Sequence, residues 1–147
     1  MSKQYDPKMH SAEHLLNQTM VRMFGCSRCF SAHINKTKSK CDYYFDRSLT
    51  EAEIKLLQEK VNQEIEKDHP VIIDVMSKED AQKQFNLERV PEKEDLADLR
   101  IVRIGDYDAC PCIGPHVSST KKIGQFKITT AGFENNVLRI RFKLLEF

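Results

Sequence analysis

Apolar residues recur at helical spacing in two segments of the first half of the chain. The first segment follows Asp6 and Pro7, an N-cap residue and a first-turn proline, and it ends at Gly25. The second starts at a capping box formed by Thr50 and Glu53. The pattern predicts two amphipathic helices whose inward positions are Ala12, Leu15, Leu16, Thr19, Met20 and Met23 in the first, and Ile54, Leu57, Val61 and Ile65 in the second.

Shorter runs, β-branched or alternating with polar residues, predict strands at 29–35, 41–45, 71–76, 99–104, 124–130 and 137–142. A lysine-rich turn joins the first two, and Asn135 and Asn136 form the turn before the last. The run at 71–76 is mostly apolar, which is typical of a buried strand. A short helix at 77–85 and a charged connection at 86–98 follow it. These elements predict an α+β fold, with an antiparallel sheet and two main helices, in a single domain spanning residues 1–147.

The balance of charge limits the partners of the protein. Its 147 residues carry 23 Lys and Arg against 22 Asp and Glu, a net charge of +1. This excludes a strongly basic nucleic-acid binder but permits a local basic patch. No apolar run approaches the ~20 residues of a membrane span, and the N-terminus lacks the apolar core of a signal peptide. We therefore expect a cytoplasmic protein that has neither DNA nor a membrane as partner. Its five cysteines, an odd number, argue against a disulfide framework.

Two pairs of residues far apart in the sequence have the chemistry of a metal site. His10 and His14 are four apart on the first predicted helix, so both imidazoles lie on one face. Histidines at this spacing also occur simply as caps or surface residues. Downstream, Cys112 and His116 flank a Gly-Pro turn that can aim both side chains at one point. Three imidazoles and a thiolate suit tetrahedral Zn²⁺, and the two pairs together predict one zinc site.

A zinc-protease site is one alternative. The segment 10–14 also matches the inverted HxxEH motif, in which Glu13 would be the general base. That interpretation leaves the downstream Cys/His pair unexplained. We therefore expect Glu13 to be solvated or to orient a ligand imidazole.

A four-thiolate structural zinc site is the other alternative. The first cysteine pair has the spacing of a zinc knuckle, whereas the second has a single intervening residue, which is tighter than usual. The four cysteines are Cys26, Cys29, Cys110 and Cys112.

The segments from His10 to Leu16 and from Cys112 to Val117 resemble the HxxxH and CxxxH signatures of the editing domains of alanyl- and threonyl-tRNA synthetases, and of the free-standing alanyl-tRNA deacylases. The similarity runs from about His10 to Phe142 and includes the segments 44–46, 49–54, 61–65 and 123–128 and Thr120. It implies the fold of a synthetase editing domain and a zinc-dependent hydrolase. This hydrolase would deacylate mischarged tRNA in trans without ATP, most simply Ser- or Gly-charged alanine tRNA. A threonyl-type editor of Ser-charged threonine tRNA and a non-catalytic, zinc-stabilised tRNA-binding module are the alternatives.

In this interpretation the tRNA acceptor end is the partner, and His10, His14, Cys112 and His116 act through Zn²⁺. Backbone amides near Gly114 would stabilise the oxyanion. Further candidates are Ser31 and His33 for substrate binding, Lys36, Lys38, Lys40, Lys121 and Lys122 for phosphate contacts, and Phe30, Tyr43 and Tyr44 for stacking on the terminal adenosine. Four protein ligands make a closed site, whereas catalytic zinc keeps one position open. Either one residue does not bind, or substrate displaces one, or the metal only shapes the pocket.

Overall fold

The computed structural model of the protein describes residues 6–85 and 98–145. Within these residues the helices are α1 (Pro7–Phe24), α2 (Glu51–Glu66), α3 (Lys78–Gln84) and the 3-10 helix η1 (Thr120–Ile123). The strands are β1 (Ser31–His33), β2 (Ser39–Tyr44), β3 (Val71–Ser77), β4 (Asp98–Ile104), β5 (Asp108–Pro111), β6 (Gln125–Glu134) and β7 (Val137–Leu145).

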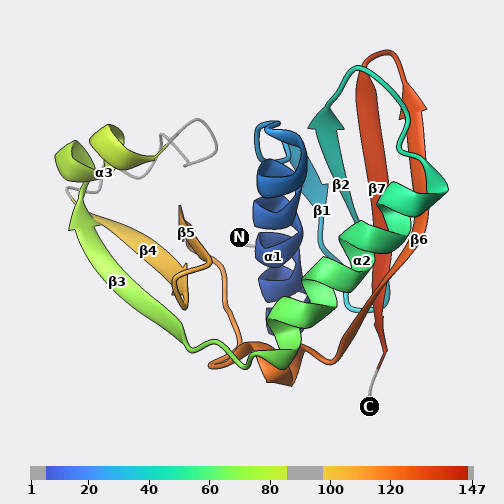
Figure 1. The fold of residues 1–147 in the computed structure, drawn as a ribbon. Helices are drawn as coiled ribbons and strands as arrows, with labels where there is room; N and C mark the ends of the chain where they lie inside the picture. Colours follow the sequence, from blue (N-terminus) through green and yellow to red (C-terminus); the bar gives the residue numbers. More distant parts are fainter. Residues whose placement is uncertain (1–5, 86–97, 146–147) are drawn as a thin grey trace.

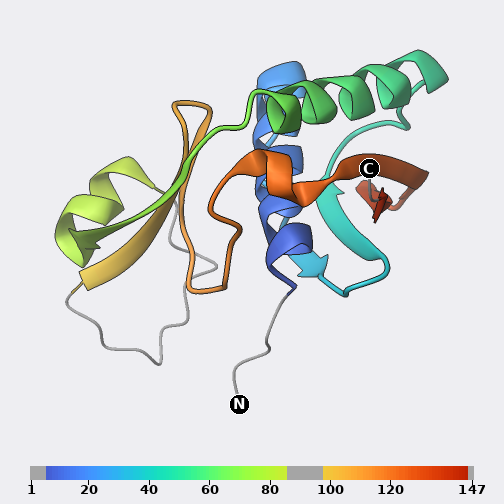
Figure 2. The same ribbon diagram turned by 90° about the horizontal axis from the view of Figure 1, so that it is seen from below.

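These strands form two antiparallel sheets, one on each side of α1 (Figures 1 and 2). The first sheet has the strand order β1-β2-β7-β6, and the second has the order β3-β4-β5. The predicted α+β class, with antiparallel strands and two main helices, is confirmed. The division of the strands between two sheets was not predicted.

The start of both main helices, and the end of the first, are those that the sequence predicts. The Asp6 carboxylate accepts hydrogen bonds from two backbone N–H groups of the first turn of α1, and Gly25 ends the helix with φ of 67°. Thr50 and Glu53 bond to each other's backbone N–H groups in a reciprocal capping box. Local side-chain chemistry therefore fixes where each helix begins.

The main core lies between the two helices and one face of the four-stranded sheet. Leu15 of α1 and Leu57 of α2 are fully buried, and so are the sheet residues Tyr43, Phe126 and Phe142. Asn135 and Asn136 form the β6–β7 turn, both with positive φ, as predicted. The core holds α1 in place, so that the opposite face of α1 can carry polar groups.

The expectation of a buried strand at 71–76 is wrong. β3 is an edge strand of the three-stranded sheet, and Ile72, Ile73 and Val75 are 53%, 44% and 70% exposed. Few of the described residues pack against this sheet. Its core cluster comprises the buried residues Ala81, Leu99 and Ile101 with a few partly buried neighbours. Apolar composition predicted the strand correctly but could not predict what covers it.

Other differences concern short elements. β5 and η1 were not predicted, and β6 and β7 extend beyond their predicted ends. The predicted connection at 86–98 lies, apart from Asp98, outside the described residues. No helix in the described part of the chain is long and apolar enough to span a bilayer.

Candidate metal centre

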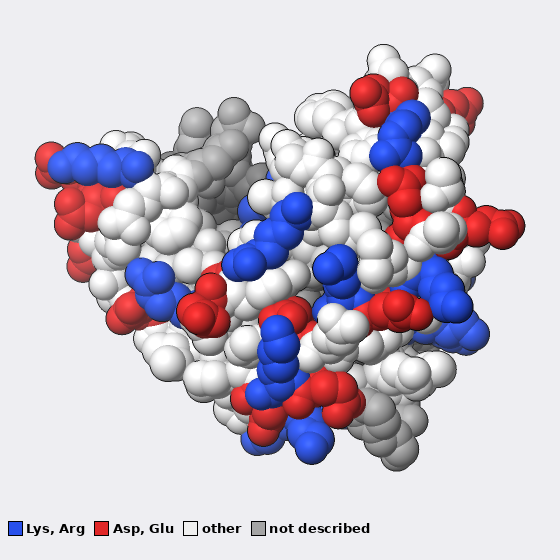
Figure 3. Space-filling view, viewed as in Figure 1, with Lys and Arg blue, Asp and Glu red and all other residues white. Residues whose placement is uncertain are grey.

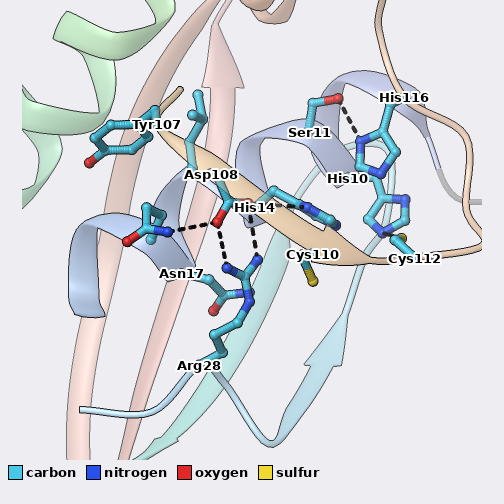
Figure 4. A network of polar contacts seen from close by, with 12 residues as sticks. His10, Ser11, His14, Asn17, Arg28, Tyr107, Asp108, Cys110, Cys112 and His116 are labelled. Atoms are coloured by element: carbon cyan, nitrogen blue, oxygen red, sulfur yellow. Dashed lines mark hydrogen bonds and ion pairs between the residues drawn. The ribbon is translucent and has the colours of Figure 1, made fainter. Parts of the chain in front are cut away.

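Four potential metal ligands that are distant in sequence meet beside the N-terminal half of α1 (Figure 4). The ligand-type atoms of His10, His14, Cys112 and His116 all lie within 4.8 Å of one another. The two histidines of α1 are buried, and the two residues after β5 are half-buried. Among the described residues this is the one group of His, Cys, Asp or Glu that could hold a metal ion. The structure thus brings together the four residues selected from the sequence.

The imidazoles pack directly against one another. His10 and His14 stand one turn apart with ring centroids separated by 5.1 Å. The ring of His116 stacks on that of His10 at 4.3 Å and meets that of His14 edge-on at 4.4 Å. The helical spacing and the loop therefore direct all three rings to one point, as the sequence analysis expected.

Strand β4 holds the loop that carries the other half of the cluster. Arg100 Nη1 donates to the carbonyl oxygen of Gly114 at 2.6 Å and to that of Cys112 at 3.3 Å. The backbone N–H of Cys112 donates to the Arg100 carbonyl oxygen at 3.0 Å. One guanidinium group therefore fixes the turn between the two downstream ligands.

The two histidines of α1 are oriented through their Nδ1 atoms. His10 Nδ1 lies 3.2 Å from the carbonyl oxygen of Pro115, which can only accept, so Nδ1 carries the proton. His14 Nδ1 lies 3.5 Å from Oδ2 of the buried Asp108, at ion-pair distance but without a hydrogen bond. In both rings Nε2 is then the atom left to coordinate, an arrangement common among zinc-binding histidines.

His116 is oriented by a hydroxyl group of α1. Its Nδ1 lies 3.0 Å from Oγ of Ser11, which also accepts from the backbone N–H of Val117 at 3.1 Å. Because a hydroxyl oxygen has two lone pairs, Ser11 can accept from both donors. The buried Nε2 of His116 has no hydrogen-bond partner in the described part of the chain.

The electrostatics of the cluster favour the metal-binding protonation state of Cys112 and His116, whereas they favour the protonated form of His14, whose proton a metal ion would have to displace. Burial raises the pKa of the Cys112 thiol, but the neighbouring imidazoles of His10, His116 and His14 lower it by more, so that it lies at about 3. Burial lowers the pKa of His116 to about 4. Burial also lowers the pKa of His14, yet Asp108 and Cys112 raise it well above 6.5. A thiolate and a neutral His116 are the forms that bind metal ions.

These residues fit Zn²⁺. A buried polar atom without a partner costs roughly 1–3 kcal/mol, and coordination of a metal by Nε2 of His116 would satisfy it. Three imidazole nitrogens and one thiolate form a complete tetrahedral donor set of the kind that zinc prefers. The donor atoms already lie close together because helix packing and the Arg100 contacts place them there.

The other predicted substrate-binding residues differ in position. Gly114 is buried in the loop between the two downstream ligands, so it lies next to the cluster. Ser31 and His33 lie on β1 opposite Asp42 and Lys40, on the sheet face that points away from the core. The structure does not bring these two residues to the cluster, and a role in substrate binding stays a prediction for all three.

Several expectations from the sequence need correction. Glu13 is 4% exposed and is therefore not solvated. Tyr43 is fully buried and its hydroxyl donates to Asn17 Oδ1, so it cannot stack on an adenosine. Cys112 is the one cysteine in the described metal-binding group, and the four-thiolate alternative finds no support.

Sequence reasoning missed the polar network behind His14. Oδ1 of Asp108 accepts from Arg28 Nη1 at 2.7 Å and from Gln18 Nε2 at 2.9 Å (Figure 4). Ser11 was also missed as the partner of His116. Asp108 lies on the unpredicted strand β5, and Ser11 is flanked by more conspicuous residues, so no pattern in one sequence marked either of them.

A groove of about 770 Å³ lies elsewhere, between the C-terminal half of α1, α2 and the turn between β4 and β5. It is lined by residues such as Arg22, Lys60 and Tyr107 and shares no residue with the cluster. Acidic and basic side chains alternate around it, and they do so over the face shown in Figure 3.

The fold and the cluster define a class: an α+β domain whose first helix and a distant loop form a candidate metal centre of three histidines and one cysteine. Within this class, residues 99–141 match the family described as the threonyl and alanyl tRNA synthetase second additional domain. The matched segment contains Cys112 and His116.

Three relatives extend the similarity over most of the chain. The protein is 36% identical over 135 residues to alanine–tRNA ligase 1 of Lachnoclostridium phytofermentans, covering 90% of this chain and 15% of the ligase. For the alanine–tRNA ligase of Rickettsia typhi the identity is 35% over 120 residues, 81% of this chain and 14% of the ligase. For that of Bdellovibrio bacteriovorus it is 30% over 133 residues, 89% of this chain and 15% of the ligase.

The chain is therefore similar to the second additional domain of threonyl and alanyl tRNA synthetases over residues 99–141 and to alanine–tRNA ligases over most of its length, and the resemblance inferred from the sequence is confirmed. It spans about 15% of the length of the ligases that it matches.

Proposed function

We propose that this protein is a cytoplasmic, zinc-dependent hydrolase that deacylates mischarged tRNA in trans. The expected substrates are Ser- and Gly-charged alanine tRNA. One observation carries the proposal: three imidazoles and a thiolate converge in a chain related to alanyl and threonyl tRNA synthetase domains. The ester bond of an aminoacyl-tRNA is already activated, so its hydrolysis needs no ATP.

The chemistry required is attack of water on the ester carbonyl at the terminal adenosine. When bound, Zn²⁺ supplies a Lewis acid that can polarise this carbonyl or acidify a water molecule. The protein's own contribution is orientation: Asp108 and Ser11 fix the rings of His14 and His116. Gly114, in the loop held by β4, offers a backbone N–H near the cluster as a donor to the oxyanion.

Catalysis requires that one of the four donors yields its position. His10 and His14 are buried on a helix that is packed into the core, whereas the other two ligands are half-buried on a loop. The proposal is therefore that substrate displaces a loop ligand. Specificity would then come from the size of the pocket and from a polar group that binds the serine hydroxyl, because a site built to bond a hydroxyl discriminates between substrates more strongly than one that senses only a methylene group.

The decisive experiment is a deacylation assay with the purified, zinc-loaded chain. Ser- and Gly-charged alanine tRNA and Ser-charged threonine tRNA are incubated separately with the protein. We expect release from the charged alanine tRNAs, and loss of release in the His14→Ala and Cys112→Ala variants. Cys26→Ala, a thiol change outside the cluster, is the matched control and should keep activity. Release from the threonine tRNA alone would instead favour the threonyl-type editor.

A non-catalytic, zinc-stabilised tRNA-binding module is the second candidate, and the four-donor set favours it because closed zinc sites are typically structural. This candidate predicts tightly held zinc and salt-dependent tRNA binding without turnover on any of the three substrates. Turnover that persists in metal-free protein would contradict both candidates.

A further inference from the structure

The four-stranded sheet has a second face that no described element covers. α1 and α2 both pack on its inner side (Figure 1). Strand alternation turns every second residue of β7 into the core, and the residues between them point outward. Between Val137 and Leu145, which occupy the two ends, the outward residues of β7 are all basic: Arg139, Arg141 and Lys143.

Neighbouring strands add cations to the same face at directly opposite positions. Lys40 of β2 lies opposite Arg141, and Lys127 of β6 lies opposite Lys143. Like charges directly opposite each other destabilise a sheet. Among the described residues no carboxylate forms an ion pair with any of these four side chains, whereas the adjacent Arg139 is bound by Asp42 at 2.7 Å. Folding does not explain two such pairs, because they cost stability.

An exposed aromatic pair stands at one end of this outer face. Tyr44 follows Lys40 and Asp42 at alternate positions of β2, so its side chain points to the same side. It is 67% exposed, and the ring of Phe30 stacks on it with a centroid separation of 4.0 Å and an angle of 15°. Cations beside exposed aromatic rings are the combination with which proteins bind nucleic-acid strands.

We propose that the outer face of the four-stranded sheet, formed by Lys40, Lys127, Arg141 and Lys143, is a second RNA-docking surface. The cations contact RNA phosphates, and Tyr44 offers a ring for stacking to an unpaired base. In a molecule of net charge +1, this face carries the cations Lys40, Lys127, Arg139, Arg141 and Lys143 against the carboxylates of Asp42 and Glu134, so it is net positive. The choice of RNA over another polyanion rests on the proposed function.

The position of α1 excludes this surface from contact with the reacting ester. Leu15 and Leu16 of α1 pack into the core shared with the sheet, whereas the metal cluster lies on the side of α1 that faces β5. The outer face therefore lies behind the helix, away from the cluster. Its occupant is a part of the RNA other than the charged 3′ end.

The test measures binding of an unaminoacylated alanine tRNA transcript at several salt concentrations, so no deacylation is needed. Each phosphate contact removed should lower the slope of log affinity against log salt by about one. The Lys40→Gln/Arg141→Gln variant should therefore bind more weakly, with a slope lower by about two. Its melting temperature should be equal or higher, because a repulsive pair is removed. Lys127→Gln/Lys143→Gln tests the other pair independently.

The matched control is Lys55→Gln/Lys83→Gln, which makes the same change in net charge at exposed positions of α2 and α3. This control should keep the wild-type slope. An unchanged slope in both sheet variants, or an equal fall in the control, would overturn the proposal. The proposal would also be overturned if the sheet variants lost binding to vesicles of anionic lipid but kept their binding to RNA. If deacylation fails in every assay while the sheet variants lower the slope, the docking surface stands and the proposed hydrolase does not.

Discussion

The Nδ1 atom of His14 lies 3.5 Å from Oδ2 of Asp108, and this contact joins the ligand-bearing helix to β5. Asp108 is 4% exposed and also binds Arg28 at 2.7 Å. Burial raises the pKa of the Asp108 carboxyl, but Arg28 and His14 lower it well below 3.8. The carboxylate thus stays ionised beside Nδ1 of His14, at ion-pair distance, which leaves Nε2 of this ring for the cluster.

Replacing Asp108 by Asn should weaken zinc binding by roughly 10–100-fold, the range typical of the carboxylate partners of ligand histidines. The amide keeps the shape of the side chain but removes the charge that orients His14. Zinc affinity is measured by competition with a chelator, with circular dichroism as a check that the variant is folded. Asp106→Asn, an exposed change in the preceding turn, should bind zinc as the wild type does. Wild-type affinity in the Asp108 variant would show that the contact does not orient the ligand.

Removal of zinc should destabilise the fold. The cluster joins residues as far apart as His10 and Cys112, whose Nε2 and Sγ atoms lie 3.2 Å apart. A ligand that binds only the folded state adds about 2.7 kcal/mol when its concentration is 100 times Kd. We therefore expect a chelator to lower the melting temperature of the wild type. The same chelator should have little effect on the His14→Ala variant, and equal shifts in the two proteins would contradict a site at this cluster.

The helices and the metal ligands could be predicted because their signals are local. Asp6, Gly25 and the Thr50–Glu53 box mark helix ends by contacts within a few residues. The i, i+4 spacing of His10 and His14 sets their common face whatever surrounds the helix.

The predictions that failed concern features that depend on how distant segments of the chain pack together. β-branched apolar residues occur in both buried and exposed strands, so the exposure of Val75 could not be deduced from its residue type. The alternation of β2 predicts that Tyr43 and Tyr44 face opposite sides, but only the position of α1 decides which one is buried. Asp108 acquires its role from a contact with His14, which is 94 positions away in the sequence.

The burial of Tyr43 leads to a separate prediction. Its hydroxyl donates to Asn17 Oδ1 at 2.7 Å, and the same oxygen accepts from the backbone N–H of Cys29 at 3.1 Å. Tyr43→Phe should therefore cost about 1 kcal/mol of stability, the usual net value of one hydrogen bond, with RNA binding and deacylation unchanged. Urea unfolding measures this loss. Tyr44→Phe, at an exposed position, should leave stability as it is, and a loss of RNA binding by a fully stable Tyr43→Phe variant would show that the hydroxyl group has a direct role.

Glu64 should make the stability of the fold depend on pH at the acid end. One of its oxygens accepts from Lys67 Nζ at 2.8 Å, and the other lies 2.9 Å from Nε2 of His69. Burial raises the pKa of the Glu64 carboxyl, but the contacts with Lys67 and His69 lower it by a larger amount. The pKa in the folded protein therefore lies below the ordinary 4.5. The unfolded chain then binds a proton more readily than the folded protein does. The stabilisation is complete above pH 4.5 and is lost as the pH falls toward the folded pKa.

The measurement for Glu64 is the free energy of unfolding in urea between pH 3 and pH 7. The Glu64→Gln variant cannot ionise at this position, so its stability should be lower than that of the wild type at pH 7 and the difference should narrow at low pH. Glu66→Gln is the matched control, because Glu66 is exposed on the same helix turn. The control should follow the wild-type curve. A difference between Glu64→Gln and wild type that stays constant, or widens as the pH falls, would mean that the Lys67 and His69 contacts do not favour the ionised carboxylate in solution.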